Sequence, residues 1–493
     1  MQTLLMIFAV QGLLGAFDTI YHHELTERLP WRPTAAKELK LHGIRNFFYC
    51  IIFLSLAWFA WNGIFAWLFA LMLLVEVVIT LMDFVEEDRS RKLPATERIT
   101  HTILALNYGV ILALLAPILW QWSQQPTGFV AMNFGLLSWI MTLYAAGVLV
   151  WGCRDFLRGL SWSKKAESKT AATKKTKKLP LGIDALHKPN QHILVTGGTG
   201  FIGRPLCQAF IDQGHQVTIL TRSMTTAAGL FHGRVTLVES LDLINDKDSV
   251  DIIINLAGES ISQRWSTKAK INMRQSRTKT TEALIALIAR LTHKPAVFIS
   301  GSAIGIYGTD EEKSFTEETP PAHDFLGAYP RDICEEWEAA AKKAEKFLVR
   351  TCLLRTGVVL EMDGGALAQM LFPFDFGLGG PMGSGKQWFS WIHRDDLIRL
   401  IVHSINNNHL HGAINATAPE PVTNKLFSKA LGHAMGRPAL IPLPAFQVKL
   451  LFGKMGESLL LAGQKVLPQK AVASGFIFNF PTLELALEKI FMK

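Results

Sequence analysis

Residues 192–203 have the sequence HILVTGGTGFIG, and residues 216–220 have the sequence QVTIL. The first five residues predict a short buried strand, and the glycines predict a tight turn into a helix that runs to about Gly214. The second apolar run predicts the next strand. Strand, glycine turn, helix and strand in this order indicate a right-handed βαβ unit, the repeating element of a doubly wound parallel sheet.

The glycines of the turn lie at Gly197, Gly200 and Gly203. In such turns the first glycine permits the sharp bend, the second lets backbone approach a pyrophosphate, and the third lets helix and strand pack closely. The next strand ends in Thr221-Arg222-Ser223, without an acidic residue. Because a cation suits a 2′-phosphate, we predict NADP as the cofactor. The alternative interpretation of Arg222 is a solvated residue at a strand end.

Further apolar runs predict the rest of the sheet. Strands are expected at 251–257, 296–301 and 348–355, with helices at about 266–291 and 333–346. The fold class predicted for 191–440 is therefore an α/β Rossmann-like domain with a doubly wound parallel sheet. Its ligands are expected at the carboxyl ends of the strands. Residues 441–493 are predicted to form a small C-terminal α/β domain.

The N-terminal third of the chain is much more apolar. Five stretches near the ~20 residues that cross a bilayer lie at 3–21, 46–61, 64–85, 99–120 and 129–152. Arg and Lys are concentrated in 22–45, in 86–98 and after 152, whereas the connections 61–63 and 121–128 carry no charge. The positive-inside rule then places the N-terminus outside and the soluble part in the cytoplasm, with the helices in a bacterial inner membrane.

The positions of the apolar stretches and of the basic segment that follows predict an all-α transmembrane domain over 1–155 and a flexible polybasic linker over 156–190. Residues 161–180 hold seven lysines and one glutamate, a local charge of 7 − 1 = +6 in a chain of formal net charge +9. A lysine run after a membrane segment favours contact with anionic lipid of the bilayer, so no nucleic-acid partner is predicted. The five cysteines form no CxxC pair and are interpreted as free thiols in a reducing compartment.

Polar residues mark the predicted cytoplasmic ends of the first four helices. They are Asp18, His22, His23, His42, Asp83, Glu86, Glu87, Glu97 and His101. Three pairs among them are spaced i,i+4, which places the members of each pair on one helix face. Histidine and carboxylate on neighbouring helix ends are able to bind a metal ion. Because helix ends at an interface are wet, interfacial and helix-pairing roles are the favoured interpretation, and no metal ligands are assigned.

Four segments of the soluble part carry motifs in a fixed order: Thr196–Gly203, Asn255–Glu259, Ser300–Gly308 and Leu354–Gly357. They resemble the extended short-chain dehydrogenase/reductase superfamily. Further motifs, RW at 264–265, CEEWE at 334–338 and WIHRDD at 391–396, resemble its atypical subgroup of epimerase family proteins, which are NAD-dependent epimerase/dehydratase-like. That subgroup ends in a small domain of unknown function, similar to 444–491 here. The membrane domain resembles an N-terminal extension of some bacterial members.

The resemblance also implies a Tyr-xxx-Lys pair in active members, where tyrosine moves the proton and lysine lowers its pKa. Here Pro330 follows Tyr329, and Ile333 occupies the lysine position. Tyr329 is therefore predicted not to be catalytic. By the same resemblance, Ser302 matches the hydroxyl that polarises a substrate carbonyl, and Tyr307 points toward the same pocket. Ser302 and Tyr307 are the predicted catalytic residues, with a pocket-wall role as the alternative for Tyr307.

The glycine turn and the family motifs together predict the residues that bind NADP. They are Gly197, Thr199, Gly200, Phe201, Ile202, Gly203, Arg222, Asn255, Ala257, Gly258, Glu259 and Arg355. The glycine-rich loop Gly377–Lys386 is expected to line the mouth of the substrate site. His393 is interpreted as a cap of the following helix in preference to a catalytic base.

Two functions are compatible with these residues. The first is an NADP-dependent oxidoreductase or epimerase that acts on a small-molecule or lipid-linked substrate at the cytoplasmic membrane face. The second is a non-catalytic NADP-binding sensor or structural module coupled to the membrane domain. The intact cofactor site together with Ser302 and Tyr307 favours the first function, and the missing lysine at position 333 favours the second.

Overall fold

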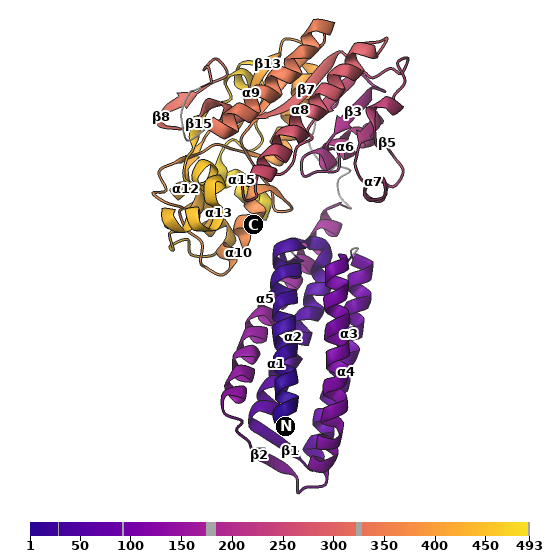
Figure 1. The fold of residues 1–493 in the computed structure, drawn as a ribbon, viewed down its shortest axis with the longest axis vertical. Helices are drawn as coiled ribbons and strands as arrows, with labels where there is room; N and C mark the ends of the chain where they lie inside the picture. The colour runs from indigo at the N-terminus through magenta and orange to yellow at the C-terminus, as the bar shows by residue number, and fades with distance from the viewer. Residues whose placement is uncertain (28, 91–92, 174–183, 322–327, 492–493) are drawn as a thin grey trace. The chain divides into compact units, whose positions relative to one another are not determined.

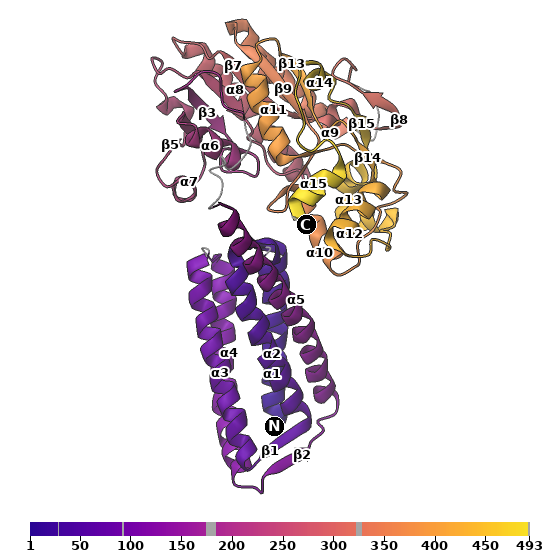
Figure 2. The ribbon, with the colours of Figure 1, turned by 180° about the vertical axis from the view of Figure 1, so that it is seen from behind.

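The structure is a computed structural model that describes residues 1–27, 29–90, 93–173, 184–321 and 328–491. The chain divides into two compact units, Met1–Lys178 and Leu179–Lys493. The first unit is a bundle of helices, and the second is a sheet covered by helices (Figures 1 and 2). Each unit is described by itself.

Five long helices build the first unit, and each overlaps one of the predicted apolar stretches. They are α1 (Gln2–Phe17), α2 (Ala36–Trp58), α3 (Ile64–Ser90), α4 (Ala95–Ser123) and α5 (Leu136–Thr173). A π-helical segment, η1, prolongs α1 over Asp18–Thr26, and the 3-10 turns η2 (Leu29–Trp31) and η3 (Pro33–Ala35) lead into α2. The described residues thus contain five helices long and apolar enough to cross a membrane.

The packing of the bundle separates two kinds of apolar surface. Phe8, Phe53 and Phe69 are buried where the helices meet. Leu106 and Leu143 point outward and are 69% and 70% exposed. Many other large apolar side chains of these helices are also exposed, and extensive exposed apolar surface is rare in soluble proteins and usual where a protein contacts lipid.

Two short strands pair at the end of the bundle where the connections carry no charge. β1 (Phe59–Asn62) pairs antiparallel with β2 (Gly128–Ala131). Residues at the start of the predicted fifth helix therefore form β2, and α5 begins only at Leu136. Aromatic and β-branched residues in both segments suit a strand pair. Gly63, with a φ of +63°, supplies the turn that follows β1.

The predicted start of the linker is wrong. α5 continues through residues 156–173, and the remaining 174–183 lie outside the described residues. The indole N–H of Trp162 donates a 3.1 Å hydrogen bond to the carbonyl of Pro30. The guanidinium of Arg158 lies 4.4 Å from the centre of the Trp31 ring. These contacts and the helix-favouring Lys and Ala residues extend the helix where composition alone suggested flexibility.

The second unit is built on a seven-stranded sheet in which all neighbouring strands are parallel. In spatial order the strands are β13 (Gly412–Ala416), β9 (Arg350–Thr356), β7 (Val297–Ala303), β6 (Ile252–Asn255), β3 (His192–Thr196), β4 (Gln216–Leu220) and β5 (Thr236–Val238). The predicted doubly wound fold is confirmed. The edge strands β5 and β13 were not predicted, because β5 is only three residues long and β13 is weakly apolar.

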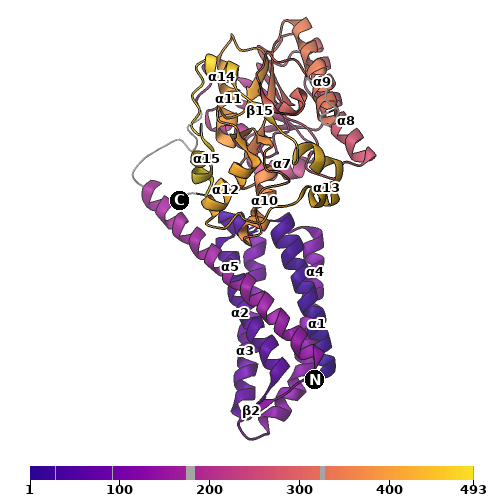
Figure 3. The ribbon, with the colours of Figure 1, turned by 90° about the vertical axis from the view of Figure 1, so that its left-hand side faces the viewer.

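Helices cover both faces of this sheet. They are α6 (Gly203–Asp212), α8 (Thr267–Arg290), α9 (Ala328–Lys342) and α11 (Arg394–Asn406). Ile193 and Val195 of β3 belong to a core with residues of α6 and α11. Leu194, on the opposite face, belongs to a core with residues of α8 and α9. Figure 3 shows α8 and α9 on the side of the sheet away from α11.

Shorter elements complete the unit: α7 (Met224–Phe231), η4 (Leu241–Leu243), η5 (Ile304–Tyr307), β8 (Asp310–Phe315), η6 (Lys343–Phe347), β10 (Val358–Leu360), α10 (Gly365–Asp375), β11 (Trp388–Phe389), β12 (Trp391–His393), β14 (Val422–Thr423), α12 (Asn424–Met435), α13 (Ala445–Leu459), β15 (Gln464–Val466), α14 (Gln469–Ala473) and α15 (Leu483–Phe491). β15 pairs with β8. Asp396 of α11 accepts hydrogen bonds from the N–H groups of Asn479 and Phe480 at 2.9 and 2.8 Å. The C-terminal residues therefore pack into the same compact unit as the sheet.

Candidate nucleotide-binding site at the carboxyl edge of the sheet

Neighbouring strands end at one edge of the sheet, and their registers bring predicted site residues together. Thr196 at the end of β3 is opposite Asn255 at the end of β6. Asn255 is opposite Ser300 in β7, and Ser302 is opposite Arg355 in β9. Parallel sheets bind ligands at this edge, so these residues flank the expected site.

The glycine turn has no room for side chains at two positions. Gly197 has a φ of +72°, and a Cβ on it would lie 2.7 Å from the carbonyl oxygen of Leu256. A Cβ on Gly203, where α6 begins, would lie 2.2 Å from the carbonyl oxygen of Gly197. Gly200, which donates its N–H to the same oxygen at 3.0 Å, is exposed. This is the geometry that lets a pyrophosphate approach the backbone.

The other predicted residues of the turn are Thr199, Phe201 and Ile202, and all three are half-buried. The Phe201 ring packs against the start of α10, since a Cβ on Gly364 would lie 2.4 Å from its Cδ2 atom. The guanidinium of Arg394 lies 5.1 Å from the centre of the ring. The Phe201 side chain thus fixes the turn against the neighbouring helix.

The Asn255 side chain supports the glycine turn through buried hydrogen bonds. Its Oδ1 accepts a 2.6 Å hydrogen bond from the Thr196 hydroxyl, and its Nδ2 donates at 2.8 Å to the hydroxyl of Thr281 in α8. The N–H of Ala257 donates at 3.3 Å to the Thr196 hydroxyl. The Asn255 side chain is fully buried. It ties β3, β6 and α8 together and shapes the loop that begins with Ala257.

Arg277, which is not among the predicted site residues, supports the loop that begins with Ala257. Arg277 of α8 donates at 3.1 Å to the carbonyl of Glu259. A Cβ on Gly258 would lie 3.0 Å from its Cζ atom. The guanidinium also lies 5.2 Å from the centre of the Trp337 ring. Burial lowers the pKa of Arg277 somewhat, but it remains a cation at neutral pH.

Arg222 is exposed just beyond the end of β4, the strand next to the glycine turn. Among the described residues, no ion pair with Arg222 is found. The neighbouring Ser223 hydroxyl lies 2.8 Å from that of Thr226. A solvated guanidinium one strand away from the turn is where a 2′-phosphate would require it.

Ser302 and Tyr307, the predicted catalytic residues, belong to a buried hydrogen-bonded network. The Ser302 hydroxyl donates at 2.7 Å to Oε1 of Glu338. The Tyr307 hydroxyl donates at 2.7 Å to Oδ1 of Asn415 and accepts a 2.9 Å hydrogen bond from Nη1 of Arg355. Tyr307 is completely buried. Burial raises the pKa of Tyr307, although the cation beside it opposes the shift.

Arg355, a predicted cofactor-binding residue, forms a buried ion pair with Glu338. Nε and Nη2 of Arg355 donate to the two carboxylate oxygens of Glu338 at 2.8 and 2.9 Å. Both side chains are buried, and a buried carboxylate requires a hydrogen-bonded cation. Burial alone would lower the pKa of the Arg355 guanidinium, but the bond to Glu338 outweighs it and raises that pKa. The Arg355 guanidinium is therefore held by the Glu338 carboxylate inside the protein.

Tyr329 and Ile333 agree with the predicted absence of a tyrosine–lysine pair. The Tyr329 hydroxyl donates at 3.0 Å to the carbonyl of Lys270, and its ring packs against Trp265 with centroids 5.0 Å apart. Ile333 is buried in a small apolar cluster. Tyr329 therefore joins α9 to α8.

His393 caps a helix, as predicted. Its Nδ1 accepts a 3.0 Å hydrogen bond from the N–H of Asp395 at the start of α11. The ring packs against Phe480 at an angle of 36°, with centroids 4.1 Å apart. Burial lowers the pKa of His393 to about 3, so the imidazole is neutral.

The glycine-rich loop Gly377–Lys386 packs on the C-terminal segment. A Cβ on Gly380 would lie 2.1 Å from the carbonyl oxygen of Ile441. The N–H of Gly383 donates at 2.9 Å to the carbonyl of Leu443. Close backbone packing thus accounts for the glycine at position 380. The position of the loop at the mouth of a substrate site stays a prediction.

Two family profiles match the second unit. Residues 193–416 match the NAD dependent epimerase/dehydratase family, and residues 443–490 match a domain of unknown function, DUF1731. The second match coincides with the C-terminal region for which the sequence analysis found a resemblance.

Several relatives share this part of the chain. The Arabidopsis thaliana protein "Epimerase family protein SDR39U1 homolog, chloroplastic" is 41% identical over 304 residues, 60% of this chain and 86% of its own. The Bacillus subtilis epimerase family protein YfhF is 38% identical over 61% of this chain and 97% of its own. The solved structure of human epimerase family protein SDR39U1 with NADPH is 35% identical, with a TM-score of 0.55, and covers 62% of this chain and 100% of that one. The chain therefore belongs to the epimerase family proteins of the extended short-chain dehydrogenase/reductase superfamily.

Proposed function

We propose that the chain is a membrane-anchored NADP-dependent oxidoreductase or epimerase that acts on a small-molecule or lipid-linked substrate at the cytoplasmic membrane face. The observation that carries the cofactor is the glycine turn with exposed Arg222 one strand away. The human relative was solved with NADPH, and the residues present here fit that cofactor. The turn from Gly197 to Gly203 would hold the pyrophosphate, and Arg222 would hold the 2′-phosphate.

The direction of the hydrogen bonds at Ser302 indicates what this side chain could do for a substrate. Bound nicotinamide would supply or accept a hydride. Ser302 gives its only hydroxyl hydrogen to Glu338, so its oxygen is left to accept a hydrogen bond from a substrate hydroxyl. Glu338 in turn is neutralised by Arg355. This arrangement supports a role for Ser302 in orienting the hydroxyl of a substrate, backed by Glu338.

The cofactor proposal is tested by exchanging Arg222. Arg222→Asp should weaken NADPH binding by more than tenfold, since a charge-assisted contact contributes about 1.5–3 kcal/mol. Binding is measured by calorimetry on the full chain, with NADH as a second ligand. Arg234→Asp is the matched control, because Arg234 is an exposed arginine paired with Asp212. Equal wild-type affinities for NADPH and NADH would contradict the proposal.

A specific observation favours the second function, a non-catalytic NADP-binding module. Both hydroxyls with a predicted catalytic role are buried and hydrogen-bonded inside the protein. The two functions are separated by following the absorbance of bound NADPH in the presence of carbonyl compounds and membrane-lipid extracts. Oxidation that Ser302→Ala slows supports the enzyme. Tight, stoichiometric NADPH that is never oxidised supports the binding module.

The membrane location rests on the five apolar helices and their exposed outer leucines. Single cysteines in a cysteine-free background test the orientation. Gln125→Cys, in the uncharged connection, should react with an impermeant maleimide in intact cells. Asp88→Cys, in a basic connection, should react only after the cells are opened. The reverse pattern would contradict the proposed orientation.

A further inference from the structure

Buried histidines and carboxylates meet at one end of the first unit. Asp18 and His23 come from the π-helical segment, His42 from α2, Glu87 from α3 and His101 from α4. Each is at most 8% exposed. From the sequence these residues are expected at wet helix ends, but the structure places their side chains inside the bundle. Ionisable residues inside a membrane bundle are costly to bury and usually functional.

The π-helical segment explains why Asp18 and His23 face each other. They are five residues apart, which places them on different faces of an α-helix. Hydrogen bonds from residue i+5 to residue i, such as that from the Glu27 N–H to the His22 carbonyl at 2.7 Å, bring such residues onto one face. Single π-turns occur often at functional sites. The i,i+4 pairing of Asp18 with His22 was foreseen, whereas the contribution of His23 was not.

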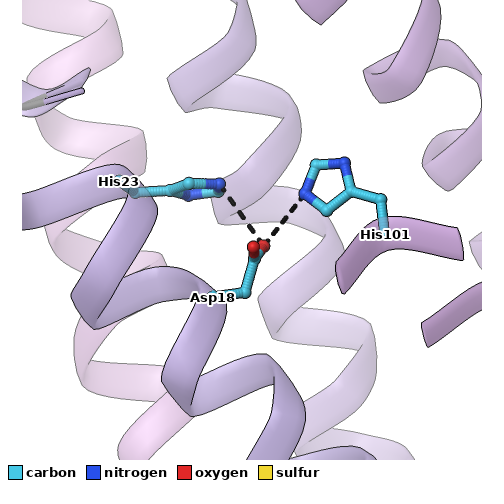
Figure 4. A group of neighbouring side chains, drawn as sticks. All are labelled: Asp18, His23 and His101. Carbon is cyan, nitrogen blue, oxygen red and sulfur yellow. Dashed lines mark hydrogen bonds and ion pairs between the residues drawn. The ribbon is translucent and has the colours of Figure 1, made fainter. Parts of the chain in front are cut away.

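Asp18, His23 and His101 point toward one another (Figure 4). Nε2 of His101 lies 3.0 Å from Oδ2 of Asp18, and Nε2 of His23 lies 3.5 Å from the same oxygen. Ligands bound about 2.1 Å from one metal ion lie about 3.0–3.4 Å apart at octahedral or tetrahedral angles. The three ligand atoms all lie within 4.8 Å of one another. The spacing therefore fits a shared ion.

The His23 ring carries a buried nitrogen that lacks a hydrogen bond. Its Nε2 makes no hydrogen bond with any described residue. Its nearest acceptors, Oδ2 of Asp18 and Oε1 of Glu97, are both 3.5 Å away. A buried polar atom without a partner is destabilising by about 1–3 kcal/mol. An ion between His23 and Asp18 would satisfy both atoms.

Neighbouring groups hold the other atoms of these ligands. Nδ1 of His101 lies 3.3 Å from Oε2 of Glu87. Oδ1 of Asp18 lies 2.8 Å from Nδ1 of His22, and Nε2 of His22 lies 3.2 Å from the hydroxyl of Thr96. Metal-binding histidines usually have a carboxylate on the other ring nitrogen, which orients the ring. Glu87 has this position toward His101.

A cavity of about 400 Å³ adjoins these ligands. Asp18 and His101 both line it, together with aromatic residues that include Tyr49, Tyr108 and Trp151. Its size suits a small ligand, and its wall is mostly apolar. The cavity would leave an ion at Asp18 and His101 accessible on one side.

We propose that the first unit binds one divalent first-row metal ion, ferrous iron, through Asp18, His23 and His101. Two histidines and one carboxylate with open positions are the ligand set of non-haem iron(II) sites. The other candidate triad, His23 with His42 and Glu87, shares the His23 nitrogen. Among the described residues, Asp18 and His101 line the cavity, whereas His42 and Glu87 do not, so only the first triad leaves an ion accessible. The cavity provides the approach for a small, largely apolar ligand.

The test is metal binding by the full chain in detergent. Chelator-treated protein is mixed anaerobically with Fe²⁺ or with Zn²⁺, desalted and analysed for metal, and Co²⁺ serves as a spectroscopic probe. Wild type should retain one Fe²⁺ per chain and give a visible Co²⁺ spectrum. Asp18→Asn, His23→Ala and His101→Ala should abolish both signals. Glu87→Gln should weaken binding about 10- to 100-fold.

Glu24→Gln is the matched control. Glu24 is a buried carboxylate next to His23 on the same π-helical segment, but it pairs with Arg154. This variant should bind the metal like wild type. Absence of Fe²⁺ and of a Co²⁺ spectrum in wild type would overturn the proposal, and binding of Zn²⁺ alone would overturn the choice of ion. Binding that His42→Gln abolishes and Asp18→Asn spares would overturn the assigned ligands.

Discussion

The two units each bury a cluster of charged side chains, and the clusters differ in how completely they are hydrogen-bonded. In the second unit, Glu338 uses both carboxylate oxygens, with bonds of 2.7 to 2.9 Å to Ser302 and Arg355. In the first unit, His23 keeps a buried nitrogen that bonds to no described residue. A network in which every polar atom is hydrogen-bonded (a closed network) fixes the positions of its members. A cluster with a buried nitrogen that lacks a hydrogen bond (an open cluster) offers that nitrogen to a ligand.

A buried ring nitrogen without a hydrogen bond is not sufficient for a metal site. His393 in the second unit also has a buried Nε2 without a partner among the described residues. Its ring lies against Phe480, and burial keeps the ring neutral with a pKa of about 3. His23 differs because carboxylates of Asp18 and Glu97 lie beside its nitrogen. The carboxylates, added to the nitrogen that lacks a hydrogen bond, distinguish the proposed ion site.

The largest effect is expected from removing the carboxylate charge of Glu338 in the second unit. Glu338→Gln should lower the free energy of unfolding of the second unit by about 3–5 kcal/mol, because it leaves the Arg355 cation buried without a counter-ion. Chemical denaturation of the full chain in detergent, followed by near-ultraviolet circular dichroism, measures the change. Glu336→Gln, on the same helix but exposed and paired with Arg274, should change stability little. Equal effects of the two substitutions would mean that the network contributes no special stability.

A smaller effect is expected from metal binding to the histidine–carboxylate cluster of the first unit. Fe²⁺ at a hundredfold excess over its dissociation constant should stabilise the first unit by about 2.7 kcal/mol, since only the folded state presents the ligands together. The change is measured as a shift in the thermal unfolding of the full chain. His101→Ala should remove the shift, and Glu24→Gln should keep it. A shift of equal size in His101→Ala would show that the ion acts elsewhere.

The fold of the second unit could be predicted because its signals are local. The glycine turn and the apolar run before it define β3 and α6 within a dozen residues, and β4, β6, β7 and β9 each carry an apolar run, whereas the edge strands β5 and β13 do not. Side-chain partners are not local. Arg355 lies at a strand end near the site, so it was expected to contact the cofactor. Its partner Glu338 lies on another element and was not identifiable from spacing.

The first unit shows a similar limit. The five apolar stretches predicted its helices, and i,i+4 spacing predicted the pairing of Asp18 with His22, which the structure confirms. The contribution of His23 depends on the π-helical segment, and the residue types and spacing of that segment are equally compatible with α-helical turns. The length of α5 was also missed, since its packing on Trp31 involves a residue far away in the sequence.

The smallest expected effect concerns the neutral His393 of the second unit. Its folded pKa of about 3 is lower than the ordinary value of 6.5, so only the unfolded chain takes up a proton as the pH falls from 6.5 toward 3. The stability that depends on neutral His393 is therefore complete above pH 6.5 and is lost below it, by about 2 kcal/mol at pH 5. His393→Asn keeps a helix-capping side chain without this titration. Denaturation at pH 7 and pH 5 should show a smaller acid loss in this variant, while His409→Asn, an exposed histidine, should behave as wild type. Identical acid losses in wild type and His393→Asn would mean that the unpaired nitrogen of His393 does titrate in the folded protein.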